Sequence, residues 1–577
     1  MLSATRLAPS ILTKLDPVNR MADSVQLEQV ATIHLTSVST SAGLTLALVF
    51  TSVVILCAIY SIPYTYFRAQ HGGWKTGWQL SERPISTAPH PKDHAGYCNC
   101  LAPRRIPRLP PSIRSTAQVP LIGLTIPQFT FLLACAGLVL FASFYQSNVI
   151  SDASRSGYVA LSLTPFVVGL GSKIGGIGTI LQVGYASVNW LHRWLGRLIF
   201  MLSTVHVIGY LVVFAREHTF LKEISEKSNQ LAIMSYIGLT IVFFISMKPI
   251  RARFWHIFKV AHHAGVILFI GGLNFHLKAT SPYLITLLIL YGFNVIMRAL
   301  TTQTTHVAFL TPLDGAKSTL ISVPTIKSGW YPGQHVRIRV GRLGWDEAHP
   351  FTISSAGGMR GVQVIAKNAG DWTRKLHAIS KDVVSEVKGH DQQKVPVSVA
   401  IEGPYGCANF LYAAYPSVLL VAGGSGVSYI LGVAEGIAQD SARGRARTRE
   451  LTLVWSVRNY AAAVDILPHF AHTIALAPAH LIFSIKIYIT ATKRTSNCTP
   501  FLCLPKEYAK YERYIELLPG RPEYNAILCD ASDAAFRHCK VGGTGVGVCG
   551  PAGMVAALKR EAWNVPGVDF HAETFSL

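Results

Sequence analysis

The sequence predicts a multi-domain membrane protein, in which an α-helical transmembrane bundle of about seven helices is followed by an antiparallel β-barrel and an α/β domain. Half of the 577 residues are hydrophobic, only 14% are charged, and the mean hydropathy is positive, which is typical of a membrane protein. Apolar runs long enough to cross a bilayer occur only before residue 300. Beyond it, short alternating segments give way to an apolar strand, a glycine turn and a helical pattern.

The first 118 residues contain one apolar run and a basic segment. The N-terminal tail has no apolar core of the signal-peptide type, so it is expected to be weakly structured, with organelle targeting as the alternative. Residues 41–67 carry no charge and are long enough to span a membrane. The proline-rich segment from Arg68 to Gln118 is strongly basic, which predicts a cytosolic loop and places the N-terminus on the other side.

Six further apolar runs complete a prediction of seven spans, at residues 119–145, 157–182, 192–215, 231–247, 254–278 and 281–299. The run 157–182 is the least regular, because several glycines and Lys173 interrupt it; a re-entrant segment is the alternative there. Alternation of sides places Lys248, Arg251 and Arg253 in a cytosolic loop, in agreement with the charge pattern.

Four histidines in two of these runs predict a pair of metal-binding sites. His192 and His206 are 14 positions apart, and so are His262 and His276. Fourteen residues are close to four helical turns, so each pair shares a helix face, with its members about 21 Å apart along the axis. Two such helices side by side would place His192 opposite His262 and His206 opposite His276. That arrangement describes two stacked hemes, each with two axial imidazoles.

Two alternatives to this interpretation remain. Any single histidine could be a polar group satisfied between helices. His263 stands next to His262, but it points about 100° away, and only His262 repeats the 14-residue spacing to His276. His262 is therefore the predicted ligand of the cytosolic-side pair.

Charge and cysteine content exclude two other classes of protein. The net charge of +22 comes from basic residues that flank the apolar runs, which indicates membrane topology and attraction to a membrane surface, not nucleic-acid binding. The ten cysteines lack the paired spacing of a zinc site or a disulfide framework.

The barrel segment contains a candidate flavin site. A flavin needs a flat apolar wall for its ring and short polar groups at its edge. One run offers both: His349, Pro350, Phe351, Thr352, Ser354 and Ser355. An ordinary buried strand is the alternative, but Gly370, Thr373 and Gly403 downstream favour the flavin.

The last segment contains a candidate dinucleotide site. Gly423, Gly424 and Gly426 lie between an apolar strand and a helix, where backbone N–H groups are open to a phosphate. Arg458 follows the next strand and could pair with a 2′-phosphate, which favours NADPH over NADH. A third strand ends in Cys549-Gly550-Pro551, which predicts a polarizable sulfur beside the nicotinamide. A structural turn and a buried structural cysteine are the alternatives.

With these motifs in this order, the chain resembles the fungal ferric/cupric reductases, relatives of the NADPH oxidases, from about residue 119 to its C-terminus. The resemblance implies two b-type hemes on the four histidines, an FAD-binding barrel, and an NADPH-binding α/β domain of ferredoxin reductase-like fold. The family's flavin-facing aromatic corresponds to Phe575, which with Cys549 would lie at the hydride-transfer position. The expected domains are 1–118 (tail, first transmembrane helix and basic loop), 119–299 (heme-binding bundle), 300–415 (FAD) and 416–577 (NADPH). Residues 495–537 match no motif and are expected to form a variable insertion.

The expected activity is that of an NADPH-dependent metalloreductase. Electrons would pass from cytosolic NADPH through FAD and two hemes to ferric or cupric ion, free or chelated, on the opposite side. The flavin is needed because a hydride delivers two electrons and a heme accepts one. A role in metal uptake with iron-uptake partners, in the plasma membrane or alternatively the vacuolar membrane, follows from the resemblance. An NADPH oxidase that reduces dioxygen and a non-catalytic sensor or transporter are the alternatives.

Overall fold

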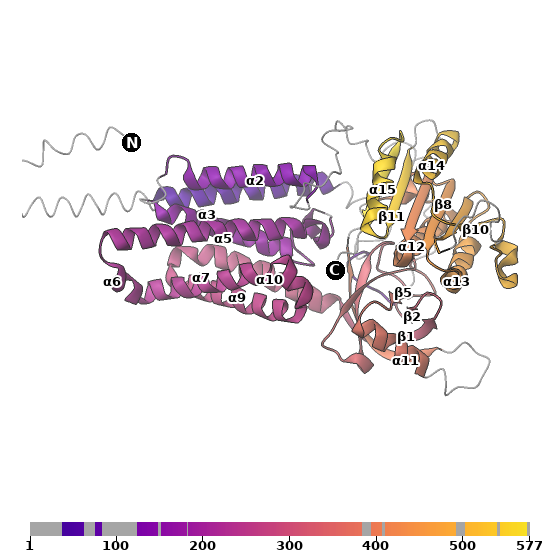
Figure 1. Ribbon diagram of the computed structural model, residues 1–577, viewed down its shortest axis with the longest axis horizontal. Helices are drawn as coiled ribbons and strands as arrows, with labels where there is room; N and C mark the ends of the chain where they lie inside the picture. Colours follow the sequence, from indigo (N-terminus) through magenta and orange to yellow (C-terminus); the bar gives the residue numbers. More distant parts are fainter. Residues whose placement is uncertain are drawn as a thin grey trace, which may run out of the picture. The chain divides into compact units, whose positions relative to one another are not determined.

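A computed structural model describes most of the chain and divides it into two compact units (Figure 1). The first unit consists of helices before residue 295, and the second contains both β-domains from residue 295 onward together with short earlier segments. The described residues are 37–62, 76–83, 124–147, 152–181, 183–382, 394–406, 410–491, 502–538 and 543–573.

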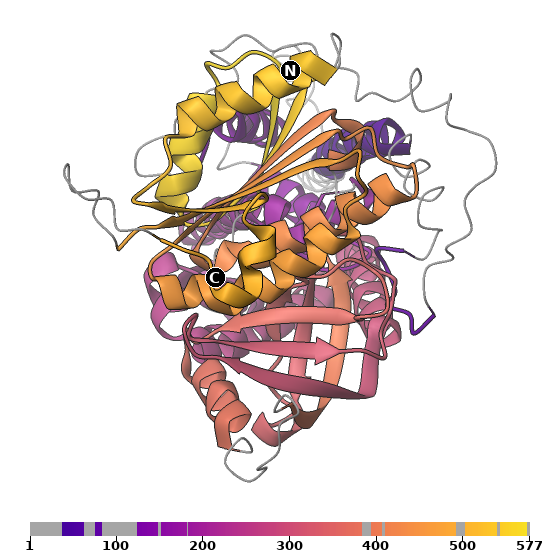
Figure 2. The same cartoon turned by 90° about the vertical axis from the view of Figure 1, so that its right-hand side faces the viewer.

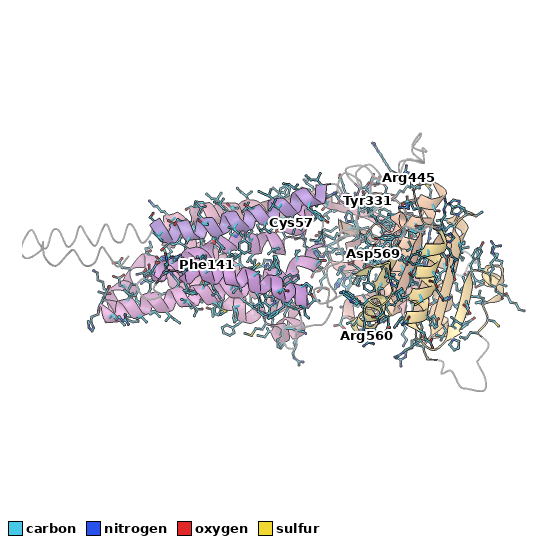
Figure 3. All side chains as sticks on the ribbon, turned by 90° about the horizontal axis from the view of Figure 1, so that it is seen from above. Cys57, Phe141, Tyr331, Arg445, Arg560 and Asp569 are labelled. Atoms are coloured by element: carbon cyan, nitrogen blue, oxygen red, sulfur yellow. The ribbon has the colours of Figure 1, made fainter. Side chains whose placement is uncertain are left out.

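Six described helices are long and apolar enough to cross a membrane, which confirms a multi-pass protein. In Figure 1 the long labelled helices of this unit lie along one another. Large apolar side chains on their surface, such as Phe141, which is labelled in Figure 3, are exposed as expected for contact with lipid. The six spans are Ser37–Ile62, α2 (Ile126–Phe144), α5 (Tyr185–Arg216), α7 (Lys227–Ile245), α9 (Trp255–His276) and Lys278–Thr301, which contains α10 (Ser281–Thr301).

The third of the seven predicted runs differs from the prediction. It forms α3 (Ala153–Gly171) and the short α4 (Ile177–Ile180), and neither is among the six spans. α3 is largely buried and packs along α5. Its buried hydroxyls bond to carbonyls of its own helix, as Ser162 does to Val159 O at 2.7 Å. These hydroxyls lower the hydropathy of α3, but they suit a helix surrounded by other helices.

Glycines set the contact between α7 and α9. A Cβ atom on Gly265 would lie 2.8 Å from the carbonyl oxygen of Gly238, and one on Gly272 would lie 2.5 Å from that of Leu231. Such close backbone approach is typical of small residues between membrane helices. Because both glycines of α9 face α7, the contact fixes the rotation of α9 about its axis. Two short helices flank α7, namely α6 (Phe220–Ser225) and α8 (Lys248–Arg253).

Six antiparallel strands form a nearly closed barrel, as predicted. Their spatial order is β4-β3-β6-β1-β2-β5, and a bridge between Ile353 and Val364 joins the two ends of the sheet. The core consists of alternating strand residues such as Ile321, Val336 and Val399, all fully buried. The elements are β1 (Thr302–Leu313), β2 (Ser318–Val323), β3 (His335–Val340), β4 (His349–Thr352), β5 (Val362–Lys367), α11 (Asp371–Asp382) and β6 (Val395–Tyr405).

The last domain is an open parallel sheet with helices on both faces (Figure 2). The strand order is β10-β9-β8-β7-β11-β12, so the order reverses between β7 and β11, where such sheets bind ligands at the carboxyl ends of their strands. Its elements are β7 (Ser417–Gly423), η7 (Gly424–Gly426), α12 (Val427–Ala442), β8 (Glu450–Val457), α13 (Tyr460–Leu476), β9 (Ile482–Ile489), β10 (Ile515–Pro519), α14 (Tyr524–His538), β11 (Thr544–Cys549), α15 (Ala552–Ala562) and β12 (Val568–Glu573).

The expectation of an insertion at residues 495–537 is wrong for its described part, 502–537. β10 adds a sixth strand by pairing with β9, and α14 covers one face of the sheet through residues such as Leu528, which is fully buried. The strand was missed because its five residues are too short for a clear alternating pattern, and charged residues surround it.

Candidate functional site

Both histidines of α5 are oriented by main-chain oxygens of α3. His192 Nδ1 lies 2.8 Å from Val167 O, and His206 Nδ1 lies 2.8 Å from Ala153 O. A carbonyl oxygen can only accept, so each Nδ1 carries the ring proton. Each Nε2 therefore keeps its lone pair, which is the state in which an imidazole binds a metal ion.

α3 makes room for each ring with a glycine four residues after the accepting carbonyl. A Cβ atom on Gly157 would lie 2.7 Å from His206 Nδ1, and one on Gly171 would lie 3.0 Å from His192 Nδ1. The two glycines are 14 residues apart, like the two histidines, and follow the opposite order along the chain. α3 thus carries the same imidazole-holding arrangement twice, at the spacing that α5 requires.

Both predicted histidines of α9 are held by serines at the two ends of α7. His262 Nδ1 lies 3.1 Å from Ser246 Oγ, and His276 Nδ1 lies 3.1 Å from the carbonyl oxygen of Ser228. All four predicted ligands therefore have an oxygen partner at Nδ1, and no Nε2 atom among them has a hydrogen bond in the described contacts.

His263 differs from His262 in both burial and partner. Its side chain is exposed, and its Nδ1 bonds at 2.6 Å to the carbonyl oxygen of Lys259, one turn earlier in the same helix. His262 is partly buried and reaches another helix. The geometry therefore favours His262 as the ligand of this pair.

The four rings lie near one another in the pairs expected from their spacing. His192 is close enough to His262, and His206 to His276, for a charge on one ring to affect the other. Among the described residues, no group of three or more histidine, cysteine or acidic side chains could hold a metal ion. Two facing imidazoles with free Nε2 atoms suit an iron whose remaining ligands come from a tetrapyrrole, so these residues fit heme.

The predicted flavin motif forms β4 at the end of the barrel sheet. His349 stacks on Trp372 with ring centroids 4.4 Å apart, and Phe351 lies 5.9 Å from the same ring. Pro350 is exposed, whereas Thr352 is buried. The motif therefore presents an aromatic wall beside an open edge, as a flavin ring requires.

The two serines of the motif hold the backbone of β5. Ser354 Oγ donates to Gln363 O at 3.0 Å, and Ser355 Oγ accepts from Gln363 N at 3.0 Å while donating to Gly361 O at 2.9 Å. Both side chains are buried. In this structure the two hydroxyls are therefore engaged within the barrel.

The beginning of α11 provides a site for an anion. Thr373 Oγ1, in the first turn, accepts the backbone N–H groups of Ala369 and Gly370, at 3.0 and 2.9 Å, and so fixes the backbone just before the helix. The remaining N–H groups of the first turn lie at the positive end of the helix dipole. The indole N–H of Trp372 is buried and has no partner among the described residues. A phosphate-bearing flavin such as FAD fits these donors.

A buried carboxylate fixes the edge of the barrel next to the flavin motif. Glu402 accepts from Arg298 Nε at 2.8 Å and lies 3.3 Å from Arg337 Nη1. Burial opposes its ionisation, but hydrogen bonds from Arg298 and Tyr405 and the charge of Arg337 outweigh it and lower the pKa of Glu402 to about 2. Arg337 also donates to Ala348 O at 3.1 Å, directly before β4. This network positions the first residues of the motif.

Gly403 follows this carboxylate in β6. Its φ of +131° lies in a region that favours glycine. In the structure Gly403 belongs to the barrel backbone and lies beside β3.

The two predicted nucleotide turns touch each other at the switch point between β7 and β11. A Cβ atom on Gly426 would lie 2.1 Å from Cys549 O, and one on Gly550 would lie 3.0 Å from Gly423 N. Gly424 has a φ of +56° and open space around its Cβ position. The backbone there is free for the close approach of a phosphate at the start of α12.

Cys549 is fully buried, and burial together with the nearby carboxylate of Glu573 raises the pKa of its thiol. The thiol is therefore protonated at neutral pH. Strand register pairs Cys549 with Glu573 on β12, a residue that the sequence motifs did not indicate. Pro551 precedes α15 as its N-terminal cap residue. Phe575 lies outside the described residues.

The carboxyl end of β8 lies beside the glycine turn. Trp455 Nε1 donates to Gly424 O at 3.0 Å, and Arg458 is exposed just after the strand. The hydroxyl of Ser456 is buried and has no hydrogen-bond partner in the part of the chain that the structure describes. An unpaired hydroxyl and an exposed guanidinium at this edge suit the ribose and 2′-phosphate of a nucleotide.

Three sequence families match the chain in the order of its domains. A ferric reductase like transmembrane component matches residues 156–273, an FAD-binding domain matches 316–409, and a ferric reductase NAD binding domain matches 415–563. Together with the fold, these matches indicate a membrane-embedded chain with FAD-binding and NAD-binding domains. Within that class, the chain is similar to the ferric reductases, whose name the transmembrane and NAD-binding models carry.

Curated relatives and solved structures are similar to this chain at low sequence identity. The chain is 24% identical over 329 residues to a probable cell surface ferric reductase of Aspergillus oryzae, which covers 53% of this chain and 43% of that protein. It is 23% identical over 367 residues to ferric/cupric reductase transmembrane component 2 of Schizosaccharomyces pombe, covering 55% of this chain and 62% of that protein. The chain therefore spans less than two thirds of their length. A ferredoxin NADP+ reductase from Neisseria gonorrhoeae with bound FAD and NADP matches 47% of this chain and 98% of its own, with 14% identity and a TM-score of 0.31.

Proposed function

We propose that the chain is a transmembrane metalloreductase that takes electrons from cytosolic NADPH and delivers them to ferric or cupric ion on the opposite side of the membrane, in support of metal uptake. The observation that carries the proposal is the set of four histidines with oriented Nδ1 atoms, paired across α5 and α9. The names of the two curated relatives, a probable ferric reductase and a ferric/cupric reductase, support metal as the acceptor.

The residues that would hold each cofactor are assigned from this geometry. His192 with His262, and His206 with His276, would each bind one b-type heme. The region of β4, Trp372 and the start of α11 would hold FAD. When bound, FAD supplies the conversion of a two-electron hydride into single electrons, and the hemes supply one-electron carriers. The proposed domains are a heme-binding bundle at 119–299, an FAD domain at 300–415 and an NADPH domain at 416–577, after the N-terminal segment 1–118.

Three arginines near the first histidine pair would neutralise the carboxylate arms of its heme. Arg193 and Arg197 of α5 lie close enough to Arg251 of α8 for their charges to repel one another. In the described part of the chain none of the three has an ion-pair partner. An anionic group at this end of the bundle would remove that repulsion.

The nucleotide would lie across the switch point between β7 and β11. Gly423, Gly424 and Gly426 would admit its phosphates to the start of α12, and Arg458 would pair with a 2′-phosphate and favour NADPH. Cys549, Gly550 and Pro551 would border the nicotinamide, with Phe575 as the proposed flavin-facing aromatic. The buried, protonated thiol of Cys549 would exclude water and offer a polarizable surface, not a nucleophile.

Acceptor-dependent oxidation of NADPH in membranes that contain the full chain tests the proposal. We expect oxidation that depends on ferric chelates or cupric ion, on NADPH in preference to NADH, and on the presence of the chain. Membranes without the chain are the control. Superoxide release without metal reduction would contradict the proposal and indicate an NADPH oxidase. Absence of any heme absorbance would favour a non-catalytic protein.

The glycines of α3 provide a second test, directed at the heme ligands. Gly157→Ala and Gly171→Ala are expected to displace the rings of His206 and His192, because the new Cβ atoms would lie within about 3 Å of them. Each variant should shift the midpoint potential of one heme or lower its occupancy. The matched control is Gly196→Ala in α5, where nothing lies within 4 Å of the Cβ position. Unchanged spectra and potentials in both α3 variants would contradict the ligand assignment.

A further inference from the structure

α12 connects the nucleotide turn directly to the flavin barrel. Its N-terminus follows Gly426, and its buried face contacts the barrel where a Cβ atom on Gly432 would lie 2.7 Å from Ile353 O and one on Gly436 would lie 2.5 Å from Pro332. No side chain fits between the helix and the barrel at these points. Any change in the position of α12 on the barrel therefore moves the nucleotide turn relative to the flavin motif.

Glu435, between those two glycines, places a buried carboxylate at this contact. Only 4% of its side chain is exposed. It lies 3.5 Å from Arg360 Nη1, accepts from Gln439 Nε2 at 3.5 Å, and is hydrogen-bonded by the backbone N–H of Ala356. His472 Nε2 of α13 lies 3.9 Å away. Arg360 and Ala356 belong to the barrel, so most of the stabilisation of this carboxylate comes from the other domain.

Arg360 reaches a second helix of the nucleotide domain with its other nitrogen. Arg360 Nη2 lies 3.0 Å from Nδ1 of His469 in α13 and donates to Oε1 of Gln363 in β5. An arginine can only donate, so His469 Nδ1 must accept and the ring is neutral, with its proton on Nε2. A single guanidinium thus joins two helices of one domain to a strand of the other.

The same contact is connected to the flavin motif. The main chain of Gln363, whose side chain accepts from Arg360, is held by Ser354 and Ser355 of that motif. A continuous set of hydrogen bonds therefore runs from the flavin motif through Arg360 to Glu435 and then along α12 to the glycine turn.

We propose that Arg360, Glu435 and His469 form an interdomain latch that positions the nucleotide turn against the flavin motif for hydride transfer. The latch rests on the proposed function, since it assumes that NADPH and FAD bind at these two motifs. None of its members belongs to the flavin motif or to the two nucleotide turns, so they are positioning residues. Hydride transfer requires the donor and acceptor atoms to be held about 3–3.5 Å apart, and a displacement of about 1 Å can slow a reaction about 100-fold.

The charge state of Glu435 makes the latch sensitive to pH. Burial raises the pKa of Glu435 to about 7, against the opposing influence of Arg360 and the Ala356 N–H. Above pH 7 the carboxylate is ionised and the ion pair with Arg360 is complete, whereas below pH 7 protonation removes it. Burial and the charge of Arg360 lower the pKa of both His469 and His472 to about 4, so these rings stay neutral through this range.

The test is the rate of flavin reduction after NADPH is mixed with the purified full-length protein loaded with FAD, at pH 6 to 8.5. In the wild type, the rate constant should fall on acidification with an apparent pKa near 7. Glu435→Gln keeps the size and hydrogen-bonding atoms of the side chain, so it should fold; it should reduce the rate about tenfold at pH 8 and abolish the inflection near pH 7. Arg360→Lys, which can reach only one of the two helices, should give an intermediate rate. The concentration of NADPH for half-maximal rate should change less than threefold in both variants.

The matched control is Arg537→Gln, which removes an exposed ion pair with Glu450 inside the nucleotide domain and should leave rate and pH profile unchanged. A Glu435→Gln variant that binds FAD and keeps the wild-type rate or the wild-type inflection overturns the latch. A wild-type protein that shows no flavin reduction by NADPH at all overturns the proposed function instead. A loss of NADPH affinity that accounts for the whole effect also overturns the latch, because it would place Glu435 in nucleotide binding.

Discussion

Replacing His192 or His262 with alanine is expected to remove one and the same heme, whereas replacing His206 or His276 removes the other. Each ring is oriented through its Nδ1 atom, and each proposed heme would be held by one histidine from α5 and one from α9, so the loss of either would remove half of its protein ligands. Each variant should lose about half of the reduced-minus-oxidised heme absorbance. Ferric chelate reduction should fall to background in all four, because in the proposed function electrons would pass both sites to cross the membrane.

His263→Ala is the matched control for His262→Ala. The two residues are adjacent, but His263 is exposed and bonds only within its own helix in the described contacts. We expect His263→Ala to keep both hemes and its reductase activity. Loss of heme in His263→Ala with retention in His262→Ala would show that the ligand assignment on α9 is wrong. Loss of different hemes in His192→Ala and His262→Ala would contradict the pairing itself.

The regular parts of the fold and site follow from short-range patterns. The 14-residue spacing of His192 and His206 needs only helical periodicity to place both rings on one face. The strand, glycine turn and helix around Gly424 follow one another directly in the sequence. This order is typical of a parallel sheet whose strands are connected by helices. These features depend on residues within about four helical turns of one another, so no tertiary contact was needed to predict them.

The partners of these residues could not be predicted, because they depend on which elements become neighbours. Gly157 and Gly171 look like interruptions of a transmembrane run, and only the antiparallel packing of α3 on α5 shows that they hold imidazole rings. Glu573 meets Cys549 through strand register alone. Arg360 and Glu435 are 75 residues apart, on different domains. The sequence offered one indication of this contact, namely a charged residue within the apolar helix α12. Burying a charge without a partner is costly, so such a residue indicates that a partner exists.

Gly426→Ala is expected to stop NADPH-dependent flavin reduction while both FAD and heme remain bound. The new Cβ atom would lie 2.1 Å from the carbonyl oxygen of Cys549, a backbone atom at the end of β11, and Gly426 itself lies in the turn that follows the adjacent parallel strand β7. Relief of that overlap requires the glycine turn and the Cys549 turn to separate, which displaces both halves of the proposed NADPH site. We expect a reduction in rate of about 100-fold or more, the size that a displacement of about 1 Å can produce.

The measurement is flavin absorbance after rapid mixing with NADPH, compared with chemical reduction by dithionite, which does not need the nucleotide site. Gly553→Ala is the matched control, because nothing lies within 4 Å of its Cβ position in α15 and alanine favours a helix over glycine by about 1 kcal/mol. This control should keep the wild-type rate. If Gly426→Ala also keeps it, the two turns do not form the nucleotide site, even though they touch. If dithionite also fails to reduce the flavin, the substitution has damaged the FAD domain. In that case the proposal that Gly426 acts only on the NADPH site is wrong.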